Sequence, residues 1–249
     1  MGLTTRVIAR LDVKPPHVVK GRRFDGLRVM GSLYECAQRA QDQGADELLY
    51  VDIVASLYGR PLNGECIDAV SRDLFIPLTV CGGIRTLEDV RTAMRLGADK
   101  VALNTAAVER ADLVGEIGRR YGAQAVVLSV EAKWMTPDWL AYTHGGRERS
   151  GLDVIQAVWL PESYGEILLT SVDRDGCGTG CDLGLIQTVR DAVRDVPIIA
   201  SGGIGMPEHA LEAIQAGADA VAVASCLYTT GLAPIKSHLK LAGVPIRDA

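Results

Sequence analysis

Two stretches of the chain, residues 76–108 and 196–228, repeat the same order of residue types at a spacing of about half the chain length. In each stretch an apolar run ends in Gly-Gly, an amphipathic segment follows, and Gly-Ala-Asp precedes a second apolar run. This order of strand, glycine turn, helix and strand is a βαβ unit. A repeat with a half-chain period predicts a closed barrel of eight units with pseudo-twofold symmetry.

The length of 249 residues agrees with this prediction, because a single (β/α)8 barrel has about 250. We therefore expect an α/β protein in which residues 1–249 form one TIM-barrel domain with a twofold half-barrel repeat. Helical patterns at 86–96 and 207–216 lie between apolar runs of strand length. The expected strands are 6–12, 47–53, 77–81, 100–104, 125–131, 166–172, 197–201 and 220–224.

The overall charge and the cysteine usage exclude several function classes. A net charge of −5 and a pI near 5.4 argue against a nucleic-acid partner, which needs a basic surface. The absence of a long apolar run and of a signal-peptide pattern predicts a cytoplasmic protein with reduced cysteines. Cys177 and Cys181 are close in sequence, but two ligands do not make a zinc site. We therefore expect neither a metal nor a cofactor.

The two Gly-Gly turns are candidate binding sites for anions. Gly83 and Gly203 each follow a strand and precede a helix, so backbone N–H groups and the helix dipole favour a phosphate there. The next strand ends in Asn104-Thr105 in one copy and in Ala224-Ser225 in the other. The alternative is that Gly-Gly only makes a tight turn. Two equivalent cradles predict a substrate with a phosphate at each end.

Alternation along the strands assigns side chains to the barrel interior. Arg10 and Asp12 share one face of the first strand, and Glu131 lies on the inward face of the fifth. We expect the Arg10 guanidinium to lie inside the barrel, within salt-bridge reach of Asp12 or Glu131. Charged residues also begin four strands: Arg6, Glu47, Lys100 and Glu166. They either face solvent or point inward and form a ring across the barrel floor.

Several long motifs resemble the cyclase subunit of imidazole glycerol phosphate synthase, and the resemblance extends over the whole chain. The motifs include L-D-V-K (11–14), T-V-C-G-G-I (79–84), A-D-K-V-A-L-N-T-A-A-V (98–108) and G-E-I-L-L-T-S-V-D-R-D-G (165–176). The resemblance implies histidine biosynthesis. It further implies a glutaminase partner docked on the barrel floor, whose ammonia helps convert a bis-phosphate ribotide into imidazole glycerol phosphate and aminoimidazole carboxamide ribotide.

The resemblance also implies roles for individual residues. Asp12 and Glu131 match the catalytic acids, and Lys20 matches a lysine on a mobile loop after the first strand. Asp46 and Asp99 match the glutaminase docking face. The remaining matches are a first phosphate site (Gly83, Asn104, Thr105), a second phosphate site (Asp175, Gly176, Gly203, Ala224, Ser225) and a salt-bridged ammonia gate (Arg6, Glu47, Lys100, Glu166).

The chain departs from the family pattern at the catalytic end. Glu131 stands where the family has aspartate, which moves the carboxyl outward by roughly 1.5 Å. Arg10 replaces a small residue, and we expect it to pair with the acids and to lower the pKa of Glu131. Cys81 replaces a glycine. These departures leave open a paralogous barrel that delivers ammonia to an amidotransferase in amidino-sugar synthesis for surface polysaccharides, and a sugar-phosphate isomerase with two phosphate sites.

Two connecting segments complete the expectations. Residues 14–24 are expected to form a loop stiffened by two prolines. Trp134 and Trp139 are expected to pack within a hairpin-like excursion after the fifth strand, whose tip at 144–150 is a solvated loop.

Overall fold

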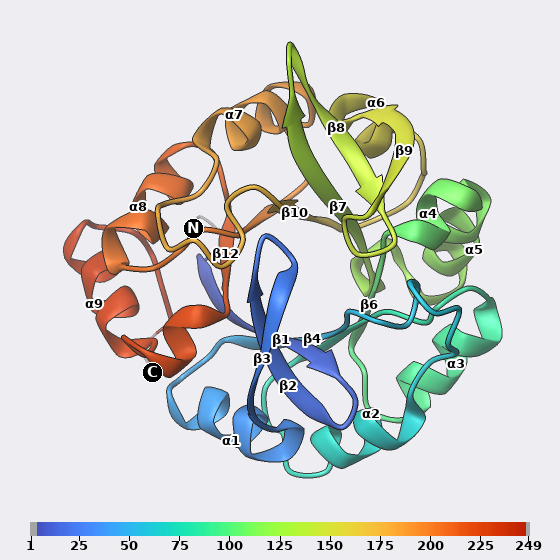
Figure 1. Ribbon diagram of the computed structural model, residues 1–249, viewed down its shortest axis with the longest axis horizontal. Helices are drawn as coiled ribbons and strands as arrows, with labels where there is room; N and C mark the ends of the chain where they lie inside the picture. The colour runs from blue at the N-terminus through green and yellow to red at the C-terminus, as the bar shows by residue number, and fades with distance from the viewer. Residues whose placement is uncertain (1–3, 248–249) are drawn as a thin grey trace.

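Parallel strands close into a barrel surrounded by helices in the computed structural model, which describes residues 4–247 (Figure 1). Closure occurs where β12 pairs with β1 and where β10 pairs with β7. The barrel strands are β1 (Arg6–Lys14), β4 (Glu47–Asp52), β5 (Leu78–Cys81), β6 (Lys100–Leu103), β7 (Val126–Met135), β10 (Glu166–Ser171), β11 (Ile198–Ser201) and β12 (Ala220–Val223). The predicted (β/α)8 fold class is confirmed.

The helices form the outer layer of the barrel. The two helical patterns expected from the sequence are α3 and α8. Thr86 begins α3 with a capping box to Asp89, and Pro207 occupies the first turn of α8. The helices are α1 (Leu33–Asp42), α2 (Gly64–Ser71), α3 (Leu87–Arg95), α4 (Thr105–Glu109), α5 (Ala111–Tyr121), α6 (Val154–Trp159), α7 (Leu183–Ala192), α8 (Pro207–Gln215) and α9 (Ala233–Leu241), with 3-10 turns η1 (Ala123–Ala125) and η2 (Ser225–Tyr228).

Alternation along each barrel strand divides the core into two apolar layers. Ile8, Leu49 and Leu168 point into the barrel and belong to one buried apolar cluster there. Val7 and Leu48 point outward and pack beneath the helices. Because adjacent residues of a strand face opposite sides, polar side chains that share the inward face lie at the floor or at the mouth of the barrel.

The Gly-Ala-Asp sequence recurs because its aspartate joins neighbouring barrel strands. The Asp99 N–H donates to the Leu78 carbonyl, and the Leu78 N–H donates back to Asp99 Oδ2, both at 2.8 Å. Asp219 and Ile198 make the same reciprocal pair at the same distances. These bonds satisfy backbone groups at the strand start, so the repeated sequence has a repeated structural cause.

Asp46 belongs to a third Gly-Ala-Asp turn, and its position corrects an expectation. The Val7 N–H donates to Asp46 Oδ2 at 2.7 Å, and the buried Lys236 ammonium donates to Oδ1 at 2.8 Å. The Asp46 carboxylate is buried and both of its oxygens are bonded inside the fold. The expectation that Asp46 presents its carboxylate to a docking partner was therefore wrong, whereas Asp99 is exposed.

Two antiparallel extensions rise from the carboxyl ends of the barrel strands. β2 (His17–Arg22) and β3 (Asp25–Ser32) form a hairpin that crosses the barrel mouth, blue at the centre of Figure 1. The expectation of an irregular loop at 14–24 was wrong, because β1 continues to Lys14 and pairs with β2.

The second extension follows β7 and contains the expected tryptophan packing. β8 (Asp138–Thr143) and β9 (Glu148–Asp153) continue the sheet from β7. Within this extension the rings of Trp134 and Trp139 meet edge to face at 4.5 Å. Among the described residues, no helix is both long and apolar enough to cross a membrane.

Candidate active site

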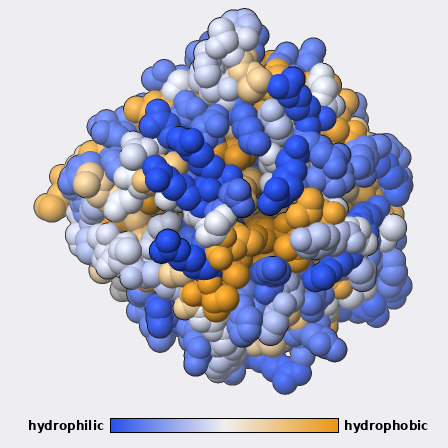
Figure 2. Space-filling model, viewed as in Figure 1, coloured by the Kyte–Doolittle hydropathy of each residue, from blue (hydrophilic) through white to orange (hydrophobic). Residues whose placement is uncertain are grey.

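A cavity of about 130 Å³ opens at the carboxyl ends of the barrel strands. Its base carries the polar side chains predicted from strand alternation, Arg10, Asp12 and Glu131. Apolar side chains line much of its wall, including Phe24, Leu27, Ile53 and Leu57. Figure 2 shows apolar surface gathered around the hollow at the barrel mouth, beside strongly hydrophilic residues. The cavity is therefore an active-site candidate in the position typical of this fold.

Asp12 accepts hydrogen bonds from two cations at the base of the cavity. Arg10 Nε donates to Asp12 Oδ1 at 2.8 Å, and Lys20 Nζ donates to Oδ2 at 2.7 Å. Burial would raise the pKa of Asp12, but Arg10 and Lys20 outweigh it and hold the pKa at about 2. Asp12 is therefore a carboxylate at every pH near neutrality.

Arg10 is fixed inside the barrel, as the alternation of β1 predicts. Its Nη1 donates to the Thr170 and Ser201 hydroxyls at 3.1 and 3.0 Å, and its guanidinium lies 5.8 Å from the centre of the Phe24 ring. Sequence reasoning did not identify Thr170 and Ser201. The same alternation rule, applied to the ends of β10 and β11, places both on the inward face.

The expectation that the Arg10 guanidinium lies within salt-bridge reach of Asp12 or Glu131 is confirmed for Asp12, whereas the expected lowering of the Glu131 pKa was wrong. Arg10 bonds to Asp12 rather than to Glu131. Glu131 is partly exposed because it lines the cavity, but its Oε2 is sealed from solvent and has no hydrogen-bond partner within residues 4–247. Burial raises the pKa of Glu131 to about 7, although the charge of Arg10 opposes this shift. The two acids thus differ in protonation.

The β2–β3 hairpin supplies Lys20 and closes over Asp12. Lys20 also contacts Asp175 at 3.2 Å, and its side chain is only 10% exposed. The Arg23 N–H donates to the Asp175 carbonyl at 2.8 Å, so the hairpin is joined to the loop after β10. The structure thus brings Lys20, Asp12 and Asp175, predicted separately, into one buried cluster.

The turn between β8 and β9 also reaches the cavity. Gly145 and Arg147 line the cavity, and the Gly146 carbonyl accepts a hydrogen bond from Lys133. A side chain at Gly146 would collide with the Phe24 ring. The expectation of a solvated tip at 144–150 was therefore wrong for residues 145 and 146, because the antiparallel extension folds this turn back over the mouth, whereas residues 147–149 are exposed.

The first predicted phosphate cradle is a hollow of about 40 Å³ beside the cavity, lined by Gly83, Thr105 and His144 among others. The His144 N–H donates to the Thr105 hydroxyl at 3.0 Å. The Asn104 amide donates to the carbonyls of Ser129 and Tyr142 at 3.0 and 3.1 Å, so it braces the β7–β8 region. His144 was missed from the sequence because only the fold brings it to this hollow.

The second predicted cradle is a smaller hollow of about 10 Å³ on the opposite half of the barrel. Gly203 has a φ of +96°, and a Cβ there would lie 2.1 Å from the Gly180 carbonyl oxygen. The close approach of these two loops therefore requires glycine. Every residue predicted for the second phosphate site lines this hollow: Asp175, Gly176, Gly203, Ala224 and Ser225. Lys20 lines it as well.

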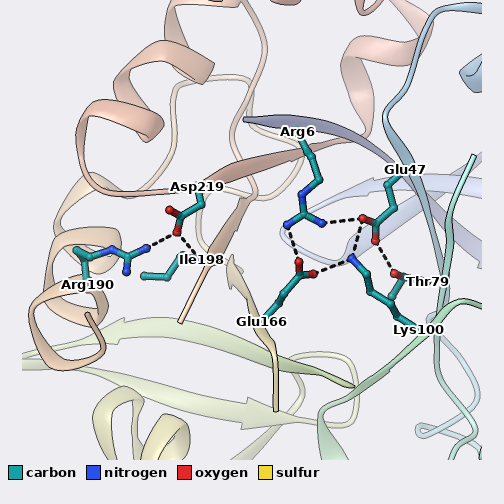
Figure 3. A network of polar contacts seen from close by, with 8 residues as sticks. All are labelled: Arg6, Glu47, Thr79, Lys100, Glu166, Arg190, Ile198 and Asp219. Atoms are coloured by element: carbon teal, nitrogen blue, oxygen red, sulfur yellow. Dashed lines mark hydrogen bonds and ion pairs between the residues drawn. The ribbon is translucent and has the colours of Figure 1, made fainter. Parts of the chain in front are cut away.

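At the opposite end of the barrel, the four charged residues that begin strands form a closed ring (Figure 3). Arg6 contacts Glu47 at 2.8 Å and Glu166 at 2.7 Å, and Lys100 contacts the same two glutamates at 3.0 Å each. Glu47 also accepts a hydrogen bond from Thr79. The Glu47 side chain is only 3% exposed, so the ring points inward rather than into solvent.

Comparisons with known proteins identify similar sequences over nearly the whole chain. A family model described as "Histidine biosynthesis protein" matches residues 6–233. The imidazole glycerol phosphate synthase subunit HisF of Myxococcus xanthus is 47% identical over 253 residues, covering 99% of both chains. The HisF subunit of Thermococcus gammatolerans is 43% identical over 251 residues (98% of both), and that of Pyrobaculum aerophilum is 44% identical over 255 (99% of this chain, 100% of the relative).

Proposed function

The chain belongs to the histidine biosynthesis protein family, among the HisF-type cyclase subunits of imidazole glycerol phosphate synthase, and we propose that it catalyses their ammonia-dependent reaction in the cytoplasm. The substrate would be a bis-phosphate ribotide, and the products imidazole glycerol phosphate and aminoimidazole carboxamide ribotide. One observation carries the proposal: a single cavity holds two carboxyl groups, Asp12 and Glu131, and has a glycine cradle on either side.

The chemistry of these groups suits the proposed reaction. Ammonia must lose a proton as its nitrogen forms a bond, and the leaving nitrogen must gain one. A pair of carboxyl groups with separated pKa values can manage such transfers. The backbone N–H groups of the cradles would hold the terminal phosphates, which fixes the reacting atoms over the acids.

We further propose that a glutaminase docks on the barrel floor and that ammonia enters through the ring of Arg6, Glu47, Lys100 and Glu166. Beside this ring, a hollow of about 390 Å³ is lined by Phe75, Pro77 and Asp99. The Phe75 side chain is 87% exposed, and an exposed aromatic residue beside a recess is a common feature of protein interfaces. The floor therefore offers a contact surface beside the proposed point of ammonia entry.

The deciding assay supplies the purified chain with the bis-phosphate ribotide and an ammonium salt, which removes the need for a glutaminase. Formation of imidazole glycerol phosphate supports the proposal. A folded chain that stimulates a cognate glutaminase but gives no product would contradict cyclase activity. That result would favour the ammonia-delivering paralogue, for which the departures at Arg10 and Glu131 are the motivating observations.

Gly203→Ala is expected to weaken the second phosphate cradle and to lower the free energy of unfolding by more than about 1 kcal/mol. The added Cβ meets the Gly180 carbonyl and must push the two loops apart. Calorimetric titration with inorganic phosphate should then lose one of two binding events. Gly243→Ala is the matched control, because its φ is also positive (+80°) but its Cβ meets nothing within 4 Å. Two unchanged binding events in Gly203→Ala would contradict the assignment.

Lys100→Met is expected to uncouple ammonia delivery while leaving the cavity intact. The substitution removes both ion pairs that Lys100 makes in the ring. Glutamine-dependent turnover should fall relative to ammonium-dependent turnover, because the first requires passage through the floor. Arg190→Met, which removes an ion pair to Asp219 beside the ring (Figure 3), should leave this ratio unchanged. Equal effects on both activities would contradict the gate.

A further inference from the structure

Asp12 and Glu131, the two acids at the cavity base, have different hydrogen-bond partners, and this difference indicates which of them can transfer a proton. Both oxygens of Asp12 are bonded to cationic groups, Arg10 Nε at 2.8 Å and Lys20 Nζ at 2.7 Å. Glu131 accepts a backbone hydrogen bond from Gly146 but none from a cation, and its Oε2 is sealed from solvent with no hydrogen-bond partner in the described part of the chain. A carboxylate held by two cations is a poor proton donor, whereas a buried carboxyl without a cation favours its neutral form.

The charges of the cluster support the same conclusion. Arg10 and Lys20 carry two positive charges. They contact or closely approach Asp12 and Asp175, which carry two negative charges. These four charges cancel. An ionised Glu131 would add an unbalanced negative charge beside them, and burial makes that charge costly.

The other groups around Glu131 do not restore the balance. Thr170 on β10 and Tyr142 on β8 are its neighbours across the sheet, and neither supplies a cation. Cys81 on β5 faces it, and burial raises the pKa of that thiol to about 12. Lys133 bonds to the Gly146 carbonyl and lies over the Tyr142 ring. Lys14, Asp52 and Arg147 line the cavity more widely.

We propose that Glu131, rather than Asp12, transfers the proton in this active site, and that Arg10 is a positioning residue that keeps Asp12 as a fixed anion. The proposal rests on the proposed cyclase function and assigns its acids. At the carbon that carries the leaving nitrogen, the ammonia-derived nitrogen forms the new C–N bond and the bond to the leaving nitrogen breaks. Neutral Glu131 gives its proton to the leaving nitrogen, and the resulting carboxylate takes one from the ammonia-derived nitrogen. In this exchange Glu131 returns to its starting state.

The position of Arg10 determines which acid stays ionised and which acid can carry a proton. Thr170 and Ser201 hold Nη1, so Nε is directed at Asp12 rather than across the barrel at Glu131. The charge of Arg10 opposes protonation of Glu131, whereas the charge of Asp12 favours it. Substitutions at these two positions should therefore move the Glu131 pKa in opposite directions, which a merely structural role does not predict.

The first test is a carbon-13 NMR titration of the full chain with labelled glutamate side chains. One carboxyl signal should titrate near pH 7 and should be missing in Glu131→Gln. Its pKa should rise in Arg10→Ala, fall in Asp12→Asn and stay close to the original value in Arg10→Lys. Glu88→Gln, at an exposed position on α3, should leave this signal unchanged. If Arg10→Ala does not fold, the fall of the Glu131 pKa in Asp12→Asn still tests the direction of the shift, and Arg10→Lys tests whether a positive charge at position 10 is sufficient. Titration of Glu131 near its ordinary value of 4.5 would overturn the proposal.

The second test is the pH dependence of turnover with ammonium salt at constant free ammonia. Because protonated Glu131 starts the cycle, kcat/KM should fall by about tenfold per pH unit above roughly pH 7. The substrate phosphates titrate near pH 6, so the assignment depends on comparison with Glu131→Gln, in which the alkaline limb should disappear.

The results of the two tests distinguish a failure of the proton-transfer proposal from a failure of the proposed cyclase function. Turnover without the expected Glu131 titration would overturn this proposal and leave the cyclase function in place. The expected titration without any turnover would contradict the cyclase function and, with it, the proton transfer. A profile with an acid limb between pH 4 and 7 that disappears in Asp12→Asn would assign a proton to Asp12 and would also overturn the proposal.

Discussion

Replacing Arg10 by alanine is expected to lower the free energy of unfolding by about 3–5 kcal/mol at neutral pH. The Arg10 side chain is 4% exposed and makes a salt bridge to Asp12, whose side chain is 7% exposed. After its removal Lys20 is left to balance both Asp12 and Asp175, and the Thr170 and Ser201 hydroxyls lose a donor. Urea unfolding followed by tryptophan fluorescence measures the change.

Two further variants separate charge from volume in this prediction. Arg10→Met keeps most of the side-chain volume and should recover little stability, because the lost charge is the cause. Arg190→Ala removes an ion pair whose arginine is 22% exposed, and its effect should be smaller because solvent screens that pair. A loss below about 1 kcal/mol in Arg10→Ala would show that the cluster rearranges to neutralise itself.

The destabilisation should also depend on pH. The pKa of Asp12 falls from 3.8 to about 2 on folding. Its ionised form therefore contributes stability above pH 3.8, and this contribution is lost as the pH falls through about 2. The difference between the wild-type chain and Arg10→Ala should be largest near neutrality and should shrink on acidification below about pH 4, because protonated Asp12 no longer needs a cation.

Asp12→Asn is expected to reduce ammonium-dependent turnover by about 10²–10³-fold. Asparagine preserves the shape of the side chain but removes the fixed negative charge between Arg10 and Lys20. The cluster then carries excess positive charge, and the electrostatic environment of the reacting atoms changes. Steady-state kinetics with saturating ribotide and ammonium salt measure the loss.

The matched control is Asp219→Asn, at the floor end of the barrel. Asp219 is also paired with an arginine and also accepts a backbone N–H, but it does not line the cavity. Its replacement should leave ammonium-dependent turnover near the wild-type level. Full turnover by Asp12→Asn, with circular dichroism showing a folded chain, would contradict a role for Asp12 in the reaction.

The barrel was predictable because its repeat and its strand alternation are both local patterns in the sequence. The two hairpins at the mouth were not predicted with the same accuracy. Most residues of β3 are exposed, so it has no buried face to produce an apolar alternation. Its pairing with β2 depends on how β1 continues past Asp12 to Lys14, which the apolar runs do not indicate.

The members of the site were predicted more reliably than their contacts. Alternation places Arg10, Asp12 and Glu131 on the inward face, but it does not give the distances that decide which acid Arg10 binds. That choice depends on Thr170 and Ser201, which arrive from strands on the other half of the chain. The sign of the Glu131 pKa shift follows from the same choice, since burial outweighs both the charge of Arg10 and the backbone hydrogen bond from Gly146 when no cation bonds to Glu131.

The hairpin across the mouth carries one of the two cations in the buried cluster, because Lys20 lies on β2. A ligand can reach the Asp12 oxygen that Lys20 occupies only when the lysine moves away. The base of the cavity then holds Arg10 against Asp12 and Asp175 and carries a net negative charge, which repels a phosphorylated ligand. Ligand retention and hairpin closure are consequently linked, and each favours the other. Each opening of the hairpin removes half of the cluster's positive charge at the moment when substrate and product exchange.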